Sequence, residues 1–429
     1  MQNERKVLVS AILKAEKNGF SNIILNSVLN ETDLDNIKKS FVTAAFYGVL
    51  ERKLTLEYVL NKYLKKPIIK TPPYTAAVLK TATYQILYME KIPSSAAVNE
   101  AVKLMKKSKE KGNSGLVNAV LRKVAEEGET LLKSVNAPEI KYSVAPWVYS
   151  KLSKQYGEEK AIAFLENSFK NPPVYIKINT LKNSNDTILS RLAEEGIVLE
   201  KTYIENCYRA KGINNIENTS AYKDGLIFVQ DYSSAFCVES IKVKPGMRVL
   251  DCCAAPGGKT FSLALNMNDE GEIISADIHS HRVGLIESGA KRLGLSAVKP
   301  RALDATVFDE TLGEFDRVLC DVPCSGMGVI RRKPEIKYKG FEECADLPEL
   351  QLKILTNASK YLKKGGRLIY STCTLLKEEN EEVVSRFLKE NTDFMSVSIN
   401  LLGVDTQWHT FLPPDSLGDG FFVAALERK

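Results

Sequence analysis

The sequence of 429 residues predicts a multidomain protein with an all-α bundle over residues 1–140, a small α+β module over 141–231 and an α/β domain over 232–429. Apolar residues at helical spacing fill the first part, mixed strands and helices follow, and strands alternate regularly with helices in the last part. The chain is 44% hydrophobic and 26% charged and has no low-complexity tract, which is typical of a globular protein.

The first part is predicted to be helical because its apolar residues recur at positions i, i+3, i+4 and i+7. Stripes of this kind run over residues 42–50, 98–105 and 116–124. Residues 1–130 also carry 21 Lys and Arg against 13 Asp and Glu. This excess of positive charge indicates a polyanionic partner such as a nucleic acid.

A lysine-rich loop separates the last two of these predicted helices, where Gly112 and Gly115 interrupt the helical pattern. We expect the basic side chains in and beside this loop to bind RNA phosphates, namely those of Lys106, Lys107, Lys109, Lys111, Arg122 and Lys123. Charge alone leaves open the alternative that this is a solvated loop without a partner.

The middle module is predicted to begin after a linker marked by Pro138 and Pro146. Its pattern predicts a helical stretch over 146–169, a strand in VYIKINTL, a helix over 184–195 and a strand in GLIFVQD. Such a short mixed segment is typical of an accessory module.

The last part is predicted to form a doubly wound parallel sheet. Its strands are read in MRVLDCC, GEIISADI, residues 298–303, FDRVLCDVP and GGRLIYSTC, with helices over 259–267, 280–293, 347–363 and 378–390. In this architecture ligands bind at the carboxyl ends of the strands, so the residues that close each strand are the candidate site residues.

The first strand of this sheet closes at Asp251 and leads through a loop of small residues into a helix at Lys259. A helix amino terminus behind such a loop favours an anionic ligand group. The loop is not a P-loop, because the leading glycine of that motif would fall on Cys253, and it lacks the dinucleotide-binding glycine spacing. Asp277 and Asp304 close the next two strands, where they could bind ribose hydroxyls and an adenine amino group, so a nucleoside cofactor is predicted.

Two cysteines follow the ends of the fourth and fifth strands, Cys324 and Cys373. A thiolate beside a methyl donor is typical of pyrimidine C5 alkylation, because its addition to C6 makes C5 nucleophilic. Asp321 could hydrogen-bond the cytosine N3 and exocyclic amine during this reaction. Spacing alone does not decide which thiol attacks.

The motifs DCCAAPGGKT, DVPCSG, STCT, GVIRRKPEIKY and DGFFVAALER resemble those of the RNA cytosine-C5 methyltransferases of the RsmB/NOP (Sun/Fmu) family, over about residues 141–429. The amino-terminal segments AAVNEAVKLMKK and GLVNAVLRKV resemble the NusB-like RNA-binding domain that accompanies the bacterial 16S ribosomal RNA members. KPE at 333–335 departs from the more usual HPD but keeps the acid after the proline.

The resemblance implies an RRM-like middle module, a Rossmann-like catalytic domain and S-adenosylmethionine as cofactor. It implies Cys373 as the nucleophile and Cys324 as the residue that assists release, with Arg331 and Arg332 as RNA contacts. The implied substrate is 16S ribosomal RNA, with cytosine 967 as the target. The implied cofactor-binding residues are Cys253, Ala254, Ala255, Pro256, Gly257, Gly258, Lys259, Asp277, Asp304 and Asp321.

Two alternatives stay open: a transfer RNA cytosine-C5 methyltransferase, and a non-catalytic RNA-binding or antitermination factor. The presence of both thiols and all three acids favours an enzyme. With eight cysteines, no C-x-x-C and three histidines, we expect reduced thiols and no metal. No membrane span or signal peptide is read in the sequence, so we expect a cytoplasmic monomer acting on naked RNA or an early small-subunit particle.

Overall fold

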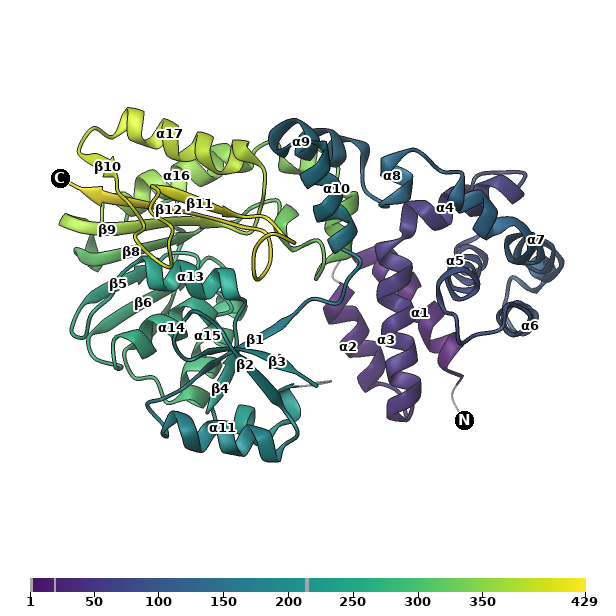
Figure 1. Ribbon diagram of the computed structural model, residues 1–429, viewed down its shortest axis with the longest axis horizontal. Coiled ribbons are helices and arrows are strands. Elements are labelled where there is room, and N and C mark those ends of the chain that lie inside the picture. The colour runs from purple at the N-terminus through teal and green to yellow at the C-terminus, as the bar shows by residue number, and fades with distance from the viewer. Residues whose placement is uncertain (1–2, 19–20, 213–215) are drawn as a thin grey trace. The chain divides into compact units, whose positions relative to one another are not determined.

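A computed structural model describes residues 3–18, 21–212 and 216–429 of the chain (Figure 1). It divides into two compact units. The helical unit contains the chain up to Phe169 together with Arg332–Gly340, and the sheet unit contains Lys170–Arg331 and Phe341–Lys429. The sequence predicts domain boundaries at residues 140 and 231. A division into compact units does not test where domains begin and end, so these boundaries stay a prediction.

The helical unit confirms the all-α prediction for the first part of the chain. The apolar stripes of the sequence face its core, where Phe46, Met105 and Leu121 are fully buried. Its helices are α1 (Glu4–Asn18), α2 (Ser21–Asn30), α3 (Asn36–Glu51), α4 (Lys53–Tyr63), η1 (Ile68–Lys70), α5 (Pro73–Tyr88), α6 (Ser94–Lys106), η2 (Lys111–Asn113), α7 (Ser114–Lys133), α8 (Pro138–Lys141), α9 (Pro146–Tyr156) and α10 (Glu158–Asn167).

Residues 332–340 belong to the helical unit although they are far from it in sequence. They contain the 3-10 turn η6 (Pro334–Tyr338). The Tyr338 hydroxyl donates to Leu50 O at 2.6 Å and accepts from Lys53 N at 3.1 Å. The Lys337 side chain is fully buried, its Nζ lies 3.2 Å from Glu51 O, and burial lowers the pKa of this amine to about 7. We call residues 332–340 the strap.

The first part of the sheet unit is a four-stranded antiparallel sheet with strand order β2-β3-β1-β4. Two of its strands, β1 and β4, were predicted, and β2 and β3 were missed because each is short and contains two charged residues. The elements are β1 (Val174–Ile178), α11 (Asn185–Glu194), β2 (Val198–Lys201), β3 (Cys207–Lys211), η3 (Ile216–Asn218), α12 (Ser220–Lys223), β4 (Ile227–Val229) and α13 (Tyr232–Ser240).

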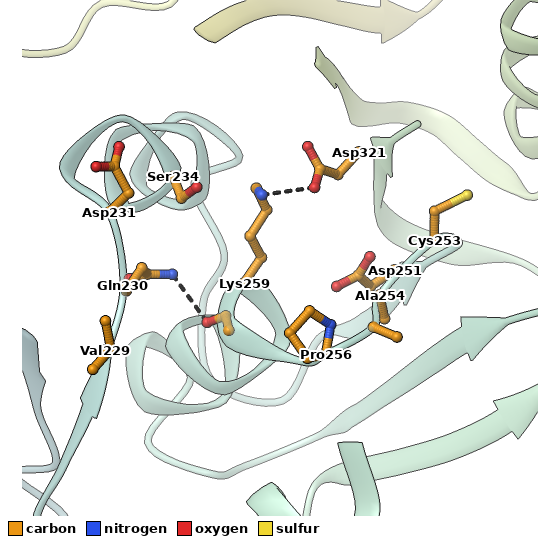
Figure 2. Close-up of a pocket in the computed structure, with 12 residues that line it drawn as sticks. Val229, Gln230, Asp231, Ser234, Asp251, Cys253, Ala254, Pro256, Lys259 and Asp321 are labelled. Atoms are coloured by element: carbon orange, nitrogen blue, oxygen red, sulfur yellow. Dashed lines mark hydrogen bonds and ion pairs between the residues drawn. The ribbon is translucent and has the colours of Figure 1, made fainter. Parts of the chain in front are cut away.

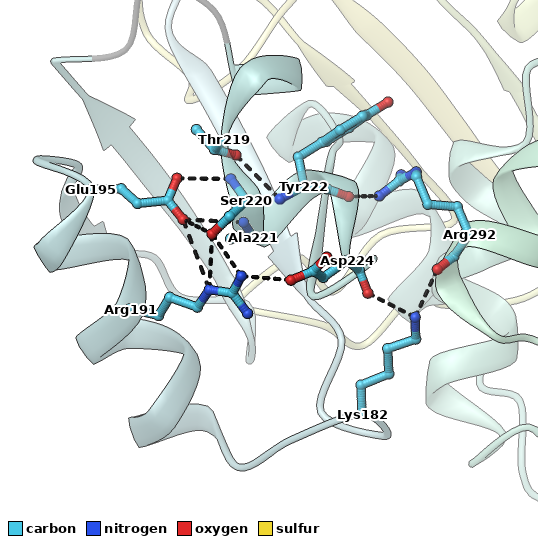
Figure 3. A network of polar contacts seen from close by, with 9 residues as sticks. All are labelled: Lys182, Arg191, Glu195, Thr219, Ser220, Ala221, Tyr222, Asp224 and Arg292. Carbon is cyan, nitrogen blue, oxygen red and sulfur yellow. Dashed lines mark hydrogen bonds and ion pairs between the residues drawn. The ribbon is translucent and has the colours of Figure 1, made fainter.

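Polar contacts anchor this small module on helix α15 (Ser280–Leu293) and the turn after it (Figure 3). Lys182 Nζ donates to Asp224 O and to Arg292 O, each at 2.8 Å. The Arg292 guanidinium donates to Tyr222 O and lies 3.8 Å from the centre of the Tyr222 ring. Gly225 has φ +71°, and a Cβ there would lie 2.0 Å from Arg292 O, so this close approach requires glycine. The module is thereby fixed to the larger sheet.

The larger sheet has the order β10-β12-β9-β8-β5-β6-β7, with β11 paired to β12. The five consecutive strands β9, β8, β5, β6 and β7 are parallel, which confirms the α/β prediction. The elements are β5 (Arg248–Asp251), α14 (Gly258–Asn266), β6 (Glu272–Asp277), β7 (Val298–Ala302), η4 (Glu310–Leu312), β8 (Phe315–Asp321), η5 (Met327–Val329), η7 (Glu342–Cys344), α16 (Leu347–Ser359), β9 (Leu362–Thr372), η8 (Lys377–Glu379), α17 (Glu381–Glu390), β10 (Phe394–Ser396), β11 (Trp408–Phe411) and β12 (Phe421–Arg428).

Both faces of this sheet are covered by helices, as a buried parallel sheet requires (Figure 1). Val249 and Ile273 share a core with residues of α13, α14 and α15. Leu250 and Ile274, the next residues on each strand, share the opposite core with residues of α16 and α17. The alternation of side chains along each strand therefore builds two cores around one sheet.

The sheet is mixed, because β12 runs antiparallel beside β9. This strand was not predicted, since its sequence FFVAALER is apolar over six residues and alternates at neither a strand nor a helix period. Among the described residues, no helix is long and apolar enough to cross a membrane.

Candidate active site

The predicted site residues gather at one edge of the large sheet. Asp251, Asp277 and Asp321 end strands β5, β6 and β8, and these parallel strands are neighbours. Asp304 follows two residues after the end of β7. The carboxyl edge of the sheet thus carries four acids, as expected for a doubly wound fold.

The loop between β5 and α14 is held against both neighbouring strands. Cys252 N donates to Leu319 O at 3.1 Å, and Ala254 N donates to Ala276 O at 2.8 Å. Gly257 caps α14 with φ +110°, and a Cβ at this position would lie 2.4 Å from the Phe261 ring. Glycine therefore allows the sharp entry into α14, whose amino terminus faces the site.

A cavity of about 190 Å³ lies above this loop (Figure 2). It is bounded by the end of β4, the start of α13, the β5–α14 loop and the end of β8. Of the predicted cofactor residues, Gly257, Asp277 and Asp304 are not among those that line it. The lining residues are Val229, Gln230, Asp231, Ser234, Asp251, Cys253, Ala254, Ala255, Pro256, Gly258, Lys259 and Asp321.

Three polar lining residues, Gln230, Asp231 and Ser234, were missed by sequence reasoning. Gln230 Nε2 donates to Gly258 O at 2.9 Å, which ties the small module to the start of α14. Asp231 caps helix α13 by accepting from Ser233 N at 3.0 Å. The signal was present, because Asp231 closes the predicted strand GLIFVQD and begins the helix-capping pattern Asp-Tyr-Ser.

An ion pair crosses the cavity between Lys259 Nζ and Asp321 Oδ2, which are 2.7 Å apart (Figure 2). Burial would lower the pKa of the Lys259 amine, but the Asp321 carboxylate outweighs this effect and raises it overall. Ser371 Oγ donates to the other oxygen of Asp321 at 2.8 Å. Asp321 is therefore held from both sides at the junction of β8 and β9.

Asp251 is fully buried on the floor of the site. Its Oδ2 accepts from Thr260 Oγ1 at 2.7 Å, whereas its buried Oδ1 has no hydrogen-bond partner among the described residues. Burial raises the pKa of this carboxyl to about 7, against the opposing hydrogen bond from Thr260. A buried polar atom without a partner that borders a cavity points to a polar ligand group there.

Asp277 and Asp304 are held by local contacts beside the cavity. Asp277 accepts from His279 N at 3.1 Å and pairs with Arg282 at 3.1 Å, and Arg282 also donates to Ala255 O at 2.8 Å. Asp304 accepts from the backbone and hydroxyl of Thr306, which lowers the pKa of its carboxyl. Both acids stand next to the loop that opens the site, within the order β5-β6-β7.

The two cysteines are in contact. Cys324 Sγ and Cys373 Sγ lie 3.2 Å apart, in the loops that follow β8 and β9. The hydrogen bond to Cys373, then burial and the nearby charges, raise the pKa of Cys324 well above its usual value. The structure thus brings together two thiols that are 49 residues apart in the sequence.

The predicted RNA-binding side chains of the helical unit lie around the α6–α7 connection. Lys123 pairs with Glu127 at 3.0 Å, and Arg122 Nε donates to Asn118 at 3.2 Å. The four lysines of the loop form no ion pair within the described chain. All six side chains are exposed, namely those of Lys106, Lys107, Lys109, Lys111, Arg122 and Lys123. Their role as RNA contacts stays a prediction.

Arg331 is engaged within the sheet unit. Its guanidinium pairs with Asp419 at 3.0 Å, with the two side chains only 10% and 5% exposed, and it also donates to Gly418 O. Arg332 is partly exposed. The structure gives Arg331 a clear role in holding residues 418–419, and RNA contact by either arginine stays a prediction.

In the described part of the chain, no group of three or more His, Cys, Asp or Glu side chains is placed to hold a metal ion. The donor set at the strand ends fits S-adenosylmethionine instead. The cavity offers the buried carboxylate of Asp251 and the partly buried ones of Asp231 and Asp321 for cationic and hydroxyl groups, and a helix amino terminus for an anionic group. With this geometry the chain falls in the class of S-adenosylmethionine-dependent methyltransferases that carry paired thiols.

Comparison with known proteins places it more closely. Residues 238–427 match the family model for 16S rRNA methyltransferase RsmB/F, residues 2–126 match the NusB family, and residues 145–209 match the ferredoxin-like domain of RsmF/B-like methyltransferases. The chain belongs to the RsmB/F family and is an S-adenosylmethionine-dependent RNA (cytosine-C5)-methyltransferase. This confirms the family resemblance. It also favours the predicted enzyme over the alternative of a non-catalytic RNA-binding or antitermination factor.

Similar proteins span the whole chain. It is 36% identical to the probable ribosomal RNA small subunit methyltransferase B of Bacillus subtilis, over 99% of this chain and 98% of that protein. It is 31% identical to ribosomal RNA small subunit methyltransferase B of Escherichia coli, over 100% and 99%.

Solved structures agree with these relatives. The crystal structure of PH0851 covers 100% of this chain and 99% of that one, with a TM-score of 0.85 and 26% identity. A methyltransferase homologue from Pyrococcus horikoshii covers 68% of this chain and 98% of that one, with a TM-score of 0.61 and 27% identity.

Proposed function

We propose that this enzyme methylates C5 of a cytosine in 16S ribosomal RNA, with S-adenosylmethionine as methyl donor and a covalent bond between Cys373 Sγ and C6 of the base. By resemblance, the target is cytosine 967. The observation that carries the proposal is the 3.2 Å contact between the two thiols, which lie in the loops that follow β8 and β9. Relatives named as small subunit methyltransferases support the ribosomal substrate.

S-adenosylmethionine, when bound, supplies an electrophilic methyl group. In this proposal Asp277 accepts hydrogen bonds from the ribose hydroxyls and Asp304 meets the adenine amino group. Residues 253–256, Gly258 and Lys259 form a wall of the cofactor site, and the amino terminus of α14 faces an anionic group. Asp251 supplies the buried oxygen that has no partner within the described part of the protein.

The thiolate of Cys373 adds to C6, so that a C6–S bond forms and the C5–C6 π electrons move to C5, the atom that accepts the methyl group. Asp321 hydrogen-bonds N3 and the exocyclic amine as charge develops on the ring. Cys324 then assists the elimination, in which the C5 proton passes to solvent, the C5–C6 double bond forms again and the bond from C6 to Cys373 breaks, so that Cys373 leaves as a thiolate. No net oxidation or reduction occurs.

The raised pKa of Cys324 supports this division of roles. A thiol that keeps its proton can donate a hydrogen bond to a thiolate beside it and stabilise that anion. In this proposal Cys373 is the member of the pair that attacks.

The RNA substrate is proposed to contact the basic α6–α7 connection and the arginines at 331 and 332, as naked 16S RNA or in an early small-subunit particle. The enzyme acts as a cytoplasmic monomer in this proposal. The target cytosine must expose a ring face, so it lies in a loop or is turned out of its stack, which costs only a few kcal/mol.

Single alanine variants of the two cysteines test the proposal. Cys373→Ala should form no covalent RNA adduct and transfer no methyl group. Cys324→Ala should methylate once and release slowly, so that an adduct stable on a denaturing gel accumulates. Cys207→Ala, in strand β3 of the small module, is the matched control and should behave as the parent enzyme.

Swapped phenotypes would assign the attack to Cys324 instead. Full methylation in both variants with no adduct would exclude covalent catalysis. Bisulfite sequencing of 16S and transfer RNA transcripts after reaction should show 5-methylcytosine in the 16S transcript alone, and modification of transfer RNA alone would overturn the proposed substrate.

A further inference from the structure

Two consecutive polar residues, Glu379 and Asn380, lie behind the cysteine loops at the junction of η8 and α17. Their side chains are 1% and 0% exposed. Neither lines the cofactor cavity, and neither takes part in the proposed chemical steps. Buried polar side chains are costly unless they are hydrogen-bonded, and the partners of these two are informative.

Glu379 holds the loop that carries Cys324. Its Oε2 accepts from Ser325 N at 2.9 Å, directly after Cys324 in the chain. The same oxygen accepts from Gln351 Nε2 at 2.8 Å, and Gln351 Nε2 also donates to Pro323 O at 2.9 Å, directly before Cys324. The peptide groups on both sides of Cys324 are therefore fixed by one carboxylate and the amide bound to it.

Asn380 holds the loop that carries Cys373 in the same manner. Its Oδ1 accepts from Thr372 Oγ1 at 2.6 Å, and its Nδ2 donates to Thr374 O at 3.1 Å. Thr372 and Thr374 are the two neighbours of Cys373 in the chain. Each of the two consecutive side chains thus brackets one of the two thiols.

The two loops are also joined to each other. Ser325 Oγ and Thr374 Oγ1 lie 2.7 Å apart, and Gly328 N donates to Cys373 O at 2.9 Å. Because the bracketing residues are adjacent in the chain, a fixed backbone sets the spacing between the loops. The 3.2 Å separation of the Cys324 and Cys373 sulfur atoms follows from this arrangement.

We propose that Glu379 and Asn380 are positioning residues that serve different steps of the reaction: Asn380 aims Cys373 for attack on C6, and Glu379 aims Cys324 for the release step. This inference rests on the proposed function of the two cysteines. A displacement of about 1 Å in a reacting group can cost about 100-fold in rate, so removing either bracket should slow the step served by its cysteine.

The test compares adduct formation and adduct release in variants of each bracket. Asn380→Ala and Thr372→Val weaken the hydrogen bonds that hold the Cys373 loop. Thr372→Val is nearly isosteric and removes only the hydroxyl. Both should slow formation of the RNA adduct by about 10- to 100-fold without accumulation.

For the Cys324 side we choose Glu379→Ala and Gln351→Leu. Both should form the adduct at nearly the parental rate but release it about 10- to 100-fold more slowly, so that adduct accumulates as in Cys324→Ala. Glu379→Gln keeps an oxygen that can accept from Ser325 N and should restore most of the release rate.

Glu382→Ala, an exposed change on α17, is the control and should leave both rates unchanged. S-adenosylmethionine affinity, measured by calorimetry, should be retained in every variant, which separates a positioning effect from loss of the fold. Thr372→Val and Gln351→Leu keep the test decisive if an alanine variant fails to fold.

Equal effects of both brackets on both steps would overturn the inference, as would accumulation of adduct in Asn380→Ala. The cysteine variants are assayed in parallel. If they behave as proposed and the bracket variants do not, the positioning inference alone fails, whereas unexpected behaviour of the cysteine variants rejects the proposed function.

Discussion

Lys259 Nζ lies 2.7 Å from Asp321 Oδ2, so a single ion pair joins the first turn of α14 to the end of β8. The side chains of Lys259 and Asp321 are only 14% and 26% exposed. In such surroundings the loss of one partner leaves a poorly hydrated charge, which costs more than the pair contributes.

We therefore predict strong coupling between these two residues in stability. Lys259→Met and Asp321→Asn should each lower the free energy of unfolding, while the double variant should lose about 0.5 to 3 kcal/mol less than the sum of the two. Urea denaturation of the four proteins measures this difference, and additive losses would show that the ion pair is not a stabilising contact.

Asp277 is predicted to contribute to cofactor affinity. Asp277→Ala should weaken S-adenosylmethionine binding by about 1 to 3 kcal/mol, because charge-assisted hydrogen bonds to the ribose are removed. Titration calorimetry measures the effect. Asp309→Asn, which changes an acid that caps η4 outside the cavity, is the control and should bind as the parent does. Unchanged affinity in a folded Asp277→Ala protein would remove Asp277 from the cofactor site.

The buried carboxyl of Asp251 predicts a pH-dependent stability. Its pKa is about 7 in the folded protein and about 3.9 in an unfolded chain, so between these values the folded state binds the extra proton. Stability should therefore fall as the pH rises from about 4 to about 7. The Asn side chain of Asp251→Asn does not titrate, so the variant is free of this pH dependence. The melting temperature of the variant, measured relative to that of the parent, should therefore rise from pH 5 to pH 8. An unchanged difference would mean that Asp251 titrates normally.

The α6–α7 connection is predicted to bind RNA through its lysine side chains. Replacing Lys106, Lys107, Lys109 and Lys111 by Gln should reduce the dependence of log affinity on log salt, by about 0.7 to 0.9 for each phosphate that is no longer neutralised. Filter binding at several salt concentrations measures this slope. The control replaces four exposed lysines elsewhere in the helical unit, namely Lys62, Lys65, Lys66 and Lys70. Equal slopes in the two variants would identify the loop as merely solvated.

Much of this site could be predicted because strand ends are visible in a sequence. Asp251, Asp277 and Asp321 each close an apolar run, and the parallel order of the strands brings those ends together. The contact between Cys324 and Cys373 could not be predicted from strand ends alone, because it also depends on β8 and β9 being neighbours in the sheet. The alternation of strands and helices indicates a parallel sheet but does not give the strand order.

The residues that hold the two cysteine loops escaped prediction for a shared physical reason. Gln351, Glu379 and Asn380 are polar, and polar residues on predicted helices are expected to face solvent. In the structure they are buried because they bind backbone groups of loops: Gln351 and Glu379 bind the loop around Cys324, which is distant in sequence, and Asn380 binds the loop just before it in the chain. No periodicity marks such a role, because the partner belongs to another segment of the chain.

The strap has a consequence for how the protein is made. The amino-terminal helices are synthesised first, yet Leu50 O and Lys53 N find their partner, the Tyr338 hydroxyl, only after the intervening residues have left the ribosome. Because 285 residues separate Lys53 from Tyr338, this delay is roughly 15 to 60 s at about 5 to 20 residues per second. During translation the leading helices therefore lack the contacts of a short peptide that is encoded after Cys324.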